Sequence, residues 1–215
     1  MRFLDRRHTP APACLSRYNH ERHEWSALAT TRADYEEVVQ SLADLQGDRC
    51  AYCECDLSSE TAAPHVEHFR RRSTARGLTF AWDNLFRSCT HAEHCGKHKD
   101  GPGLANAYAP DDLVKPDVED PRGFLTFTSD GSVAPRAGLP LRQMERADAT
   151  IRVLALNCPR LRGLRRAFLA APWARAREAL GAGFTDEDLR SLLRDEVEAW
   201  AGQPFGSAIL DLFGQ

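Results

Sequence analysis

The sequence predicts a mainly helical α+β fold built around a metal-binding core. Cysteines and histidines gather between Cys50 and Asp100, which hold five of the seven cysteines and five of the eight histidines. Apolar residues repeat at helical spacing before and after this stretch, and a short hairpin pattern follows it. We therefore expect an N-terminal arm and helix at 1–48, a metal-braced core at 49–103, and a hairpin plus helical region at 104–215.

The bulk composition is that of a soluble globular protein. The chain has 215 residues, of which 42% are hydrophobic and 27% charged, and its net charge is −3. No apolar run is long enough for a membrane span, and the first residues lack the apolar centre of a secretion signal. We therefore expect a cytoplasmic protein with no membrane contact. In that compartment, clustered cysteines bind metal more often than they form disulfides.

The elements outside the core follow from local patterns. Apolar positions between Asp34 and Leu45 have helical spacing, and Gly47 is placed to end that helix. Residues 123–134 alternate around an Asp-Gly pair, which predicts a β-hairpin. Further helices are expected from Ala147 to Asn157 and from Leu161 up to Pro172, and another is expected to begin near Thr185.

Two cysteine pairs in the core have the spacing of zinc ligands. Cys50 and Cys53 are separated by two residues, and Cys89 and Cys95 by five. Together they predict a structural Zn²⁺ held by four sulfurs. Because the second gap is wide, His91 or His94 could replace one sulfur, and Cys55 is a further thiol close by. The alternative is a reduced cluster without metal, but so small an irregular segment would then have little to hold it together.

The HVEH segment at residues 65–68 supplies a carboxylate and imidazoles. If it is a strand, Glu67 shares a face with His65, while His68 points to the other face. A carboxylate with an imidazole suits Mg²⁺ or Mn²⁺, and a neutral histidine can act as a general base. Taken alone, His68 is more often a structural histidine. His98, on a short helix after Cys95, is the candidate ligand opposite Glu67.

Basic residues lie on both sides of these candidates. Arg70, Arg71 and Arg72 directly follow the HVEH segment, and Lys97 and Lys99 flank His98. A lone basic run is as often a solvated loop as a binding surface. Beside a candidate metal site, contact with nucleic-acid phosphates is the better interpretation.

The order of these motifs carries a family resemblance. CAYC, HVEHFRRRS, WDNLFRSC and CGKHKD follow one another as in the HNH endonucleases, and the chain resembles their PtuB-like subfamily, found in Septu anti-phage defence and with retrons. The resemblance covers roughly residues 15–165. It implies a ββα-metal finger, embedded between the N-terminal helical segment and the C-terminal helical region with its hairpin. It also implies hydrolysis of nucleic-acid phosphodiester bonds, DNA more than RNA.

The resemblance assigns roles to individual residues. Glu67 stands at a metal-ligand position, His68 at the general base, and Asn84 at the position that orients the base-bearing loop. His98 is the candidate for the last metal ligand, although Gly96, Lys97 or Asp100 could align there, and His65 is an additional candidate ligand. Arg71 replaces the proline that is usual after the base.

Partners follow from the same resemblance. Members of this subfamily work beside an ABC/AAA-like ATPase of the PtuA type, so the helical region at 104–215 is expected to bind such a partner. The competing interpretation is a zinc-finger module that binds nucleic acid or a protein without cleavage. Binding without turnover under any divalent ion would favour that alternative.

Overall fold

The computed structural model describes residues 1–58, 64–104 and 107–214. Within these ranges the longer elements are α1 (Trp25–Ala29), α2 (Arg32–Gln46), β1 (Pro64–His68), β2 (Leu85–Cys89), α3 (Cys95–Lys99), β3 (Leu125–Phe127), β4 (Val133–Pro135), α4 (Leu141–Val153), α5 (Pro159–Gly181), α6 (Asp186–Ala201) and α7 (Gly206–Phe213). Each strand pair, β1–β2 and β3–β4, is antiparallel. The prediction of a mainly helical α+β chain is therefore confirmed.

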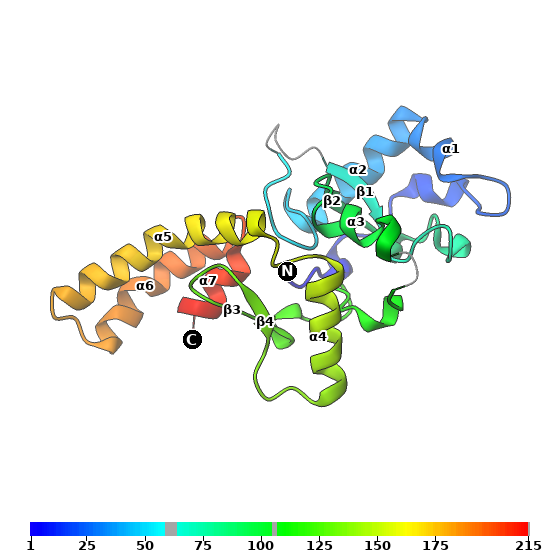
Figure 1. The fold of residues 1–215 in the computed structure, drawn as a ribbon. Coiled ribbons are helices and arrows are strands. Elements are labelled where there is room, and N and C mark those ends of the chain that lie inside the picture. Colours follow the sequence, from blue (N-terminus) through cyan, green and yellow to red (C-terminus); the bar gives the residue numbers. More distant parts are fainter. Residues whose placement is uncertain (59–63, 105–106, 215) are drawn as a thin grey trace.

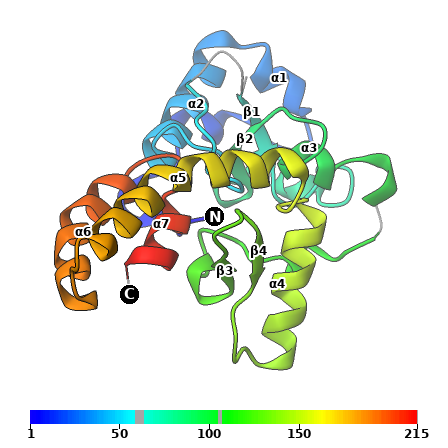
Figure 2. The same ribbon diagram turned by 60° about the vertical axis from the view of Figure 1, so that its left-hand side comes forward.

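The elements form an elongated arrangement. Figure 1 shows α1, α2, β1, β2 and α3 gathered at one end and the antiparallel helices α5 and α6 extending to the other. The view in Figure 2 places α4 and the β3–β4 pair beneath the first turns of α5. None of the helices in the described ranges is both long enough and apolar enough to cross a membrane.

Helix α2 forms as its apolar spacing predicts. Val38 and Leu42 lie one turn apart and are both fully buried. The helix ends at Gly47, whose φ of 59° is the left-handed conformation that glycine adopts without steric cost. The chain then enters the first cysteine pair directly.

Strands β1 and β2 place the HVEH segment against the core. Glu67 lies opposite Phe86, and His68 lies opposite Leu85. The residues of β2 are all buried, which fits a strand covered on both faces. Helix α3 follows within a few residues and packs against β2.

The C-terminal region follows the sequence prediction except in the bounds of two helices, of which α4 runs from Leu141 to Val153 instead of from Ala147 to Asn157. The β3–β4 hairpin turns at Gly131, and Thr185 caps α6 by accepting a hydrogen bond from the Asp188 amide. Helix α5, however, continues through Pro172 to Gly181. Pro172 is itself buried, so packing against its neighbours offsets the missing backbone hydrogen bond.

Glu54 joins three distant segments. It is 2% exposed, and its carboxylate lies 2.5 Å from the Met1 ammonium group. The same carboxylate accepts a hydrogen bond from the Ser207 amide at the start of α7, at 3.1 Å. Because Glu54 lies between Cys53 and Cys55, the cysteine cluster is tied to both the first residue and the C-terminal helices.

Candidate metal and catalytic site

Four cysteines come together in the core. The Sγ atoms of Cys50, Cys53, Cys89 and Cys95 all lie within 4.8 Å of one another, and all four residues are buried. Sulfurs bound tetrahedrally at about 2.3 Å from zinc are about 3.8 Å apart. The four sulfurs therefore fit a zinc ion without large movement, and the cluster could bind Zn²⁺ as the cysteine spacing predicts.

His94 contacts the sulfurs instead of replacing one. Its Nδ1 lies 3.5 Å from Cys89 Sγ and 3.2 Å from Cys95 Sγ, and the residue is 1% exposed. Hydrogen bonds from Cys50 and Cys53 lower the pKa of the Cys89 thiol, which favours the thiolate that binds metal. Cys55 is also buried nearby but does not belong to the set of four.

A second polar site lies beside the cluster, in a pocket of about 570 Å³. Strand β1, the loop that follows it and helix α3 form its walls. The lining consists of His65, Val66, Glu67, His68, Arg71, Arg72, Ser73, Gly96, Lys97 and Asp100. Most of the residues singled out from the sequence therefore meet in one pocket.

Glu67 is the buried carboxylate of this pocket. Its Oε2 lies 3.3 Å from His65 Nε2, and its Oε1 lies 2.8 Å from Lys99 Nζ. Burial raises the pKa of Glu67, but the contacts with His65 and Lys99 outweigh it and the net pKa is lowered. Glu67 is therefore ionised at neutral pH, as a metal ligand must be.

Gly96 determines where this carboxylate lies. A Cβ atom at position 96 would be 2.4 Å from Glu67 Oε2, far inside van der Waals contact. Only glycine leaves the first turn of α3 open to the carboxylate. Since Gly96 carries no side chain, this position of α3 cannot supply a metal ligand.

His68 lies on the other face of β1, as the strand alternation predicts. Its Nε2 is 3.0 Å from the Thr79 carbonyl oxygen, and its ring packs edge-on to Trp25 at 4.7 Å between centroids. A carbonyl can only accept, so Nε2 carries the hydrogen and Nδ1 is the basic atom. Burial lowers the pKa of His68 to about 4, so the imidazole is neutral at pH 7.

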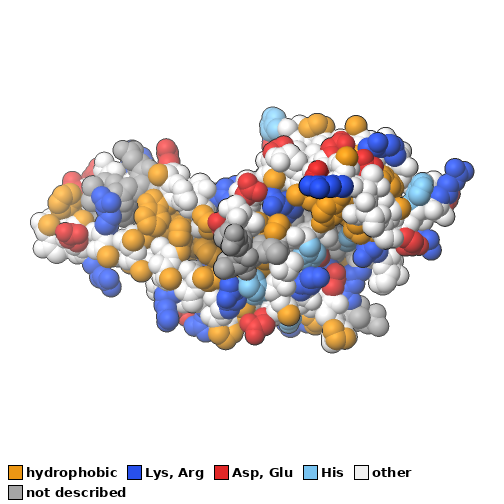
Figure 3. All heavy atoms as spheres, turned by 90° about the horizontal axis from the view of Figure 1, so that it is seen from above, with side chains coloured by type: hydrophobic (Ala, Val, Ile, Leu, Met, Phe, Trp, Pro, Cys, Tyr) orange, Lys and Arg blue, Asp and Glu red, His pale blue; other side chains and the backbone are white. Residues whose placement is uncertain are grey.

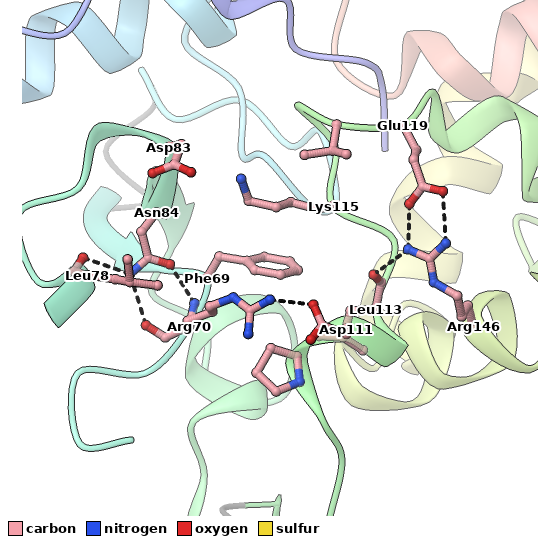
Figure 4. Close-up of a pocket in the computed structure, with 12 residues that line it drawn as sticks. Phe69, Arg70, Leu78, Asp83, Asn84, Asp111, Leu113, Lys115, Glu119 and Arg146 are labelled. Atoms are coloured by element: carbon pink, nitrogen blue, oxygen red, sulfur yellow. Dashed lines mark hydrogen bonds and ion pairs between the residues drawn. The ribbon is translucent and has the colours of Figure 1, made fainter. Parts of the chain in front are cut away.

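Asn84 fixes the loop that follows His68. Its side-chain oxygen accepts a hydrogen bond from the Arg70 amide at 2.7 Å, and its Nδ2 donates to the carbonyls of Arg70 and Leu78 at 3.0 and 3.1 Å. Figure 4 shows these bonds at the edge of a separate cavity of about 270 Å³. Asn84 thus has the contacts of a positioning residue, and it is more than the helix cap that the sequence alone could indicate.

The basic residues differ in accessibility. Arg72 and Lys97 are exposed and line the pocket. Arg71, also in the lining, pairs with Asp100 at 2.8 Å, and Arg70 pairs with Asp111. In the part of the chain that the structure describes, Arg72 and Lys97 are therefore the two cations of this set that face solvent at the pocket without an ion pair.

Lys99 corrects one expectation. Its side chain is fully buried, and its Nζ contacts Glu67, Asp100 at 2.7 Å and the His68 carbonyl at 3.1 Å. A buried ammonium group in these contacts cannot also touch a nucleic-acid phosphate. Sequence reasoning missed this structural role because a lysine between His98 and Asp100 has the pattern of an exposed helix end.

His98 is not brought to Glu67. Its Nδ1 donates to the Val153 carbonyl of α4 at 2.9 Å, and His98 is not among the side chains that line the pocket. The short α3 turns positions 96 and 99 toward Glu67 and position 98 toward α4. The geometry therefore favours His65 over His98 as the partner of Glu67.

Taken together, the fold and the site define a small α+β protein with a four-cysteine cluster beside a buried Glu-His strand. No family model matches the chain. It is 30% identical over 88 residues to the Septu protein PtuB of Bacillus thuringiensis, a match that covers 41% of this chain and 32% of PtuB. The resemblance to PtuB is thus confirmed as a distant and partial similarity, and the match spans about a third of that relative.

Proposed function

We propose that this chain is a metal-dependent HNH endonuclease in which β1, β2 and α3 form the ββα-metal finger and Cys50, Cys53, Cys89 and Cys95 hold a structural Zn²⁺. The observation that carries the proposal is that a neutral His68 and an ionised Glu67 line one pocket. The partial similarity to PtuB supports it.

A catalytic divalent ion would be held by Glu67 and His65. Two ligand atoms at right angles, each about 2.1 Å from Mg²⁺ or Mn²⁺, are about 3.0 Å apart. The 3.3 Å between His65 Nε2 and Glu67 Oε2 fits that arrangement. When bound, such an ion would neutralise charge on the phosphate and on the leaving oxygen.

His68 would act as the general base. Its Nδ1 would accept a proton from a water molecule while the water oxygen forms a bond to phosphorus. The bond from phosphorus to the leaving oxygen then breaks, and that oxygen takes a proton from solvent. Asn84 donates hydrogen bonds to the carbonyls of Arg70 and Leu78 and so holds both ends of the segment 70–78. Thr79 follows directly, and its carbonyl oxygen orients the His68 ring.

The substrate would be nucleic acid, and the PtuB-like resemblance favours DNA over RNA. Arg72 and Lys97 would contact phosphates at the mouth of the pocket, and Arg71 would do so from its wall. Phosphate contacts position a strand without reading its bases, so we expect weak sequence preference.

Plasmid nicking tests the proposal. Wild-type protein with Mg²⁺ or Mn²⁺ is expected to convert supercoiled plasmid to nicked and linear forms, and His68→Ala is expected to lose about 10²–10⁴-fold in rate. Circular dichroism of both proteins shows whether the variant is folded. Equal cleavage by a folded His68→Ala protein would remove His68 as the base.

A second candidate is a binding module that does not cleave. The ion pair between Glu67 and Lys99 favours it, because an ammonium group already neutralises the carboxylate that would hold the ion. Binding of a labelled duplex without turnover under Mg²⁺, Mn²⁺, Ni²⁺ or Co²⁺ would establish this candidate and reject the nuclease.

The C-terminal helices would bind an ATPase partner of the PtuA type, within an anti-phage defence system. Leu180 in the last turn of α5 and Phe184 in the connection to α6 are exposed at 49% and 44% of their surfaces. Figure 3 shows hydrophobic side chains gathered over this end of the molecule. Co-purification with an ATPase of the PtuA type tests the proposal, with Phe184→Glu expected to break the complex. Val118→Glu, at another exposed apolar residue, is the control.

A further inference from the structure

Arg165 is a buried cation in the second turn of α5. It is 3% exposed, and its Nε donates to the Leu161 carbonyl at 3.2 Å while Nη2 donates to the Leu156 carbonyl. Its Nη1 is buried without a hydrogen-bond partner. Both of its acceptors are neutral carbonyls, so within the described residues the positive charge has no carboxylate partner.

A buried cation that no carboxylate contacts is unfavourable unless negative charge lies near it. The cysteine cluster is a source of such charge, because sulfurs that bind a metal do so as thiolates.

The geometry brings Arg165 to that cluster. Arg165 and Cys53 line the same small internal cavity, together with Phe127 and Leu156. Glu54, the carboxylate next to Cys53, already binds the Met1 ammonium group and the Ser207 amide. Among the described residues, Glu54 makes no hydrogen bond or ion pair with Arg165.

We propose that Arg165 is the counter-cation of the zinc–thiolate centre. Four thiolates around one Zn²⁺ carry a net double negative charge in a buried place, and a guanidinium that lines one cavity with Cys53 would offset part of it. Arg165 is a positioning residue and not a ligand. Since it belongs to α5, zinc binding would also hold the C-terminal helices against the core.

The inference rests on the proposed zinc content and is tested by zinc affinity. Purified full-length protein is titrated with a chromophoric chelator, and the zinc dissociation constant is compared between variants. Arg165→Met is expected to bind zinc about 10- to 100-fold more weakly, the usual effect of losing a residue that supports metal ligands. Arg166→Met removes an exposed arginine of the same helix and is expected to leave the affinity unchanged.

A charge effect is separated from a packing effect by Arg165→Lys, which keeps the charge but not the fork of donors. It is expected to lose clearly less zinc affinity than Arg165→Met. Cobalt substituted for zinc should show the absorption of a tetrahedral four-sulfur site in both variants, since no ligand is removed.

The outcomes distinguish the proposal that the chain binds zinc from the proposed role of Arg165. A wild-type protein that binds no zinc would defeat the zinc proposal itself. A wild-type protein that binds zinc no more tightly than Arg165→Met would overturn only the role of Arg165. If Arg165→Met does not fold, the Arg165→Lys variant decides. A loss of zinc in Arg165→Lys as complete as that in Cys50→Ser would reject the role of Arg165 as counter-cation.

Discussion

The Nε2 atom of His68 lies 3.0 Å from the carbonyl oxygen of Thr79. This contact fixes the ring orientation and the tautomer together, because a carbonyl accepts only from a protonated nitrogen. Trp25 packs edge-on against the ring and adds to its burial. An imidazole held neutral, with Nδ1 basic, is ready to take a proton at physiological pH without first losing one.

The pH dependence of cleavage should reflect this burial. Below its folded pKa the imidazole is protonated and cannot act as a base, and that pKa is about 4 because burial disfavours the charged form. Nicking rates measured between pH 4 and pH 8 should therefore fall with acid near pH 4. Trp25→Ala should move this fall toward the ordinary histidine value of about 6.5. A fall near 6.5 in the wild-type protein would contradict the burial argument.

Gly96→Ala should displace Glu67. The added methyl group would lie 2.4 Å from Oε2, so either the carboxylate or α3 must move. We expect a loss of about 1–3 kcal/mol in the free energy of unfolding, measured by urea denaturation, and a loss of metal-dependent cleavage. Gly163→Ala is the matched control, because nothing lies within 4 Å of its added atom. It should be neutral or slightly stabilising, and equal destabilisation by both variants would rule out a specific role for Gly96.

Substitutions of Lys97 and Lys99 should affect different properties: DNA binding for Lys97 and stability for Lys99. Lys99→Met leaves Glu67 and Asp100 without their buried cation, which should cost about 3–5 kcal/mol in the free energy of unfolding. Lys97 is exposed, so Lys97→Met should change that free energy by only about 0.5 kcal/mol. It should instead weaken DNA binding and lower by about one the number of counterions released on binding, which sets the salt dependence of the affinity. Fluorescence anisotropy at several salt concentrations measures the second effect, and an unchanged salt slope would remove Lys97 from the interface.

His65 and His98 should differ in their effect on metal dependence. His65→Ala removes the nitrogen that lies 3.3 Å from Glu67 Oε2, so the Mn²⁺ concentration for half-maximal cleavage should rise about tenfold or more. His98→Ala removes a hydrogen bond to α4 and should leave that concentration unchanged. The opposite pattern would restore His98 as the ligand and show that α3 rotates when metal binds.

Local patterns predicted much of this molecule. Gly47 ends α2 as the sequence predicts, and the four cysteines that were selected by their spacing lie in one cluster. Strand alternation correctly separated Glu67 from His68. These features depend on neighbours in sequence or on well-defined ligand spacing, so they can be inferred without a structure.

Long-range packing decided the rest. Sequence alone could not show that Lys99 turns inward, since its partner Glu67 lies 32 positions earlier in the chain. Nor could it orient α3, a helix of a few residues whose rotation is set by Gly96 against β1 and by His98 against α4. The role of Arg165 was hidden for the same reason, because Cys53, with which it lines a cavity, lies more than a hundred residues earlier.

Removal of one cluster cysteine should unfold the core, whereas removal of Cys55 should not. Cys50 belongs to the four sulfurs within 4.8 Å, so Cys50→Ser should abolish stoichiometric zinc and the cooperative unfolding transition. Cys55 is also buried but lies outside the four, so Cys55→Ser should retain one zinc per chain. Elemental analysis after gel filtration measures the zinc, and thermal denaturation measures the transition. A stable, zinc-free Cys50→Ser protein would show that the cluster is a packed set of reduced thiols. Loss of zinc in Cys55→Ser but not in Cys50→Ser would show that Cys55 belongs to the ligand set.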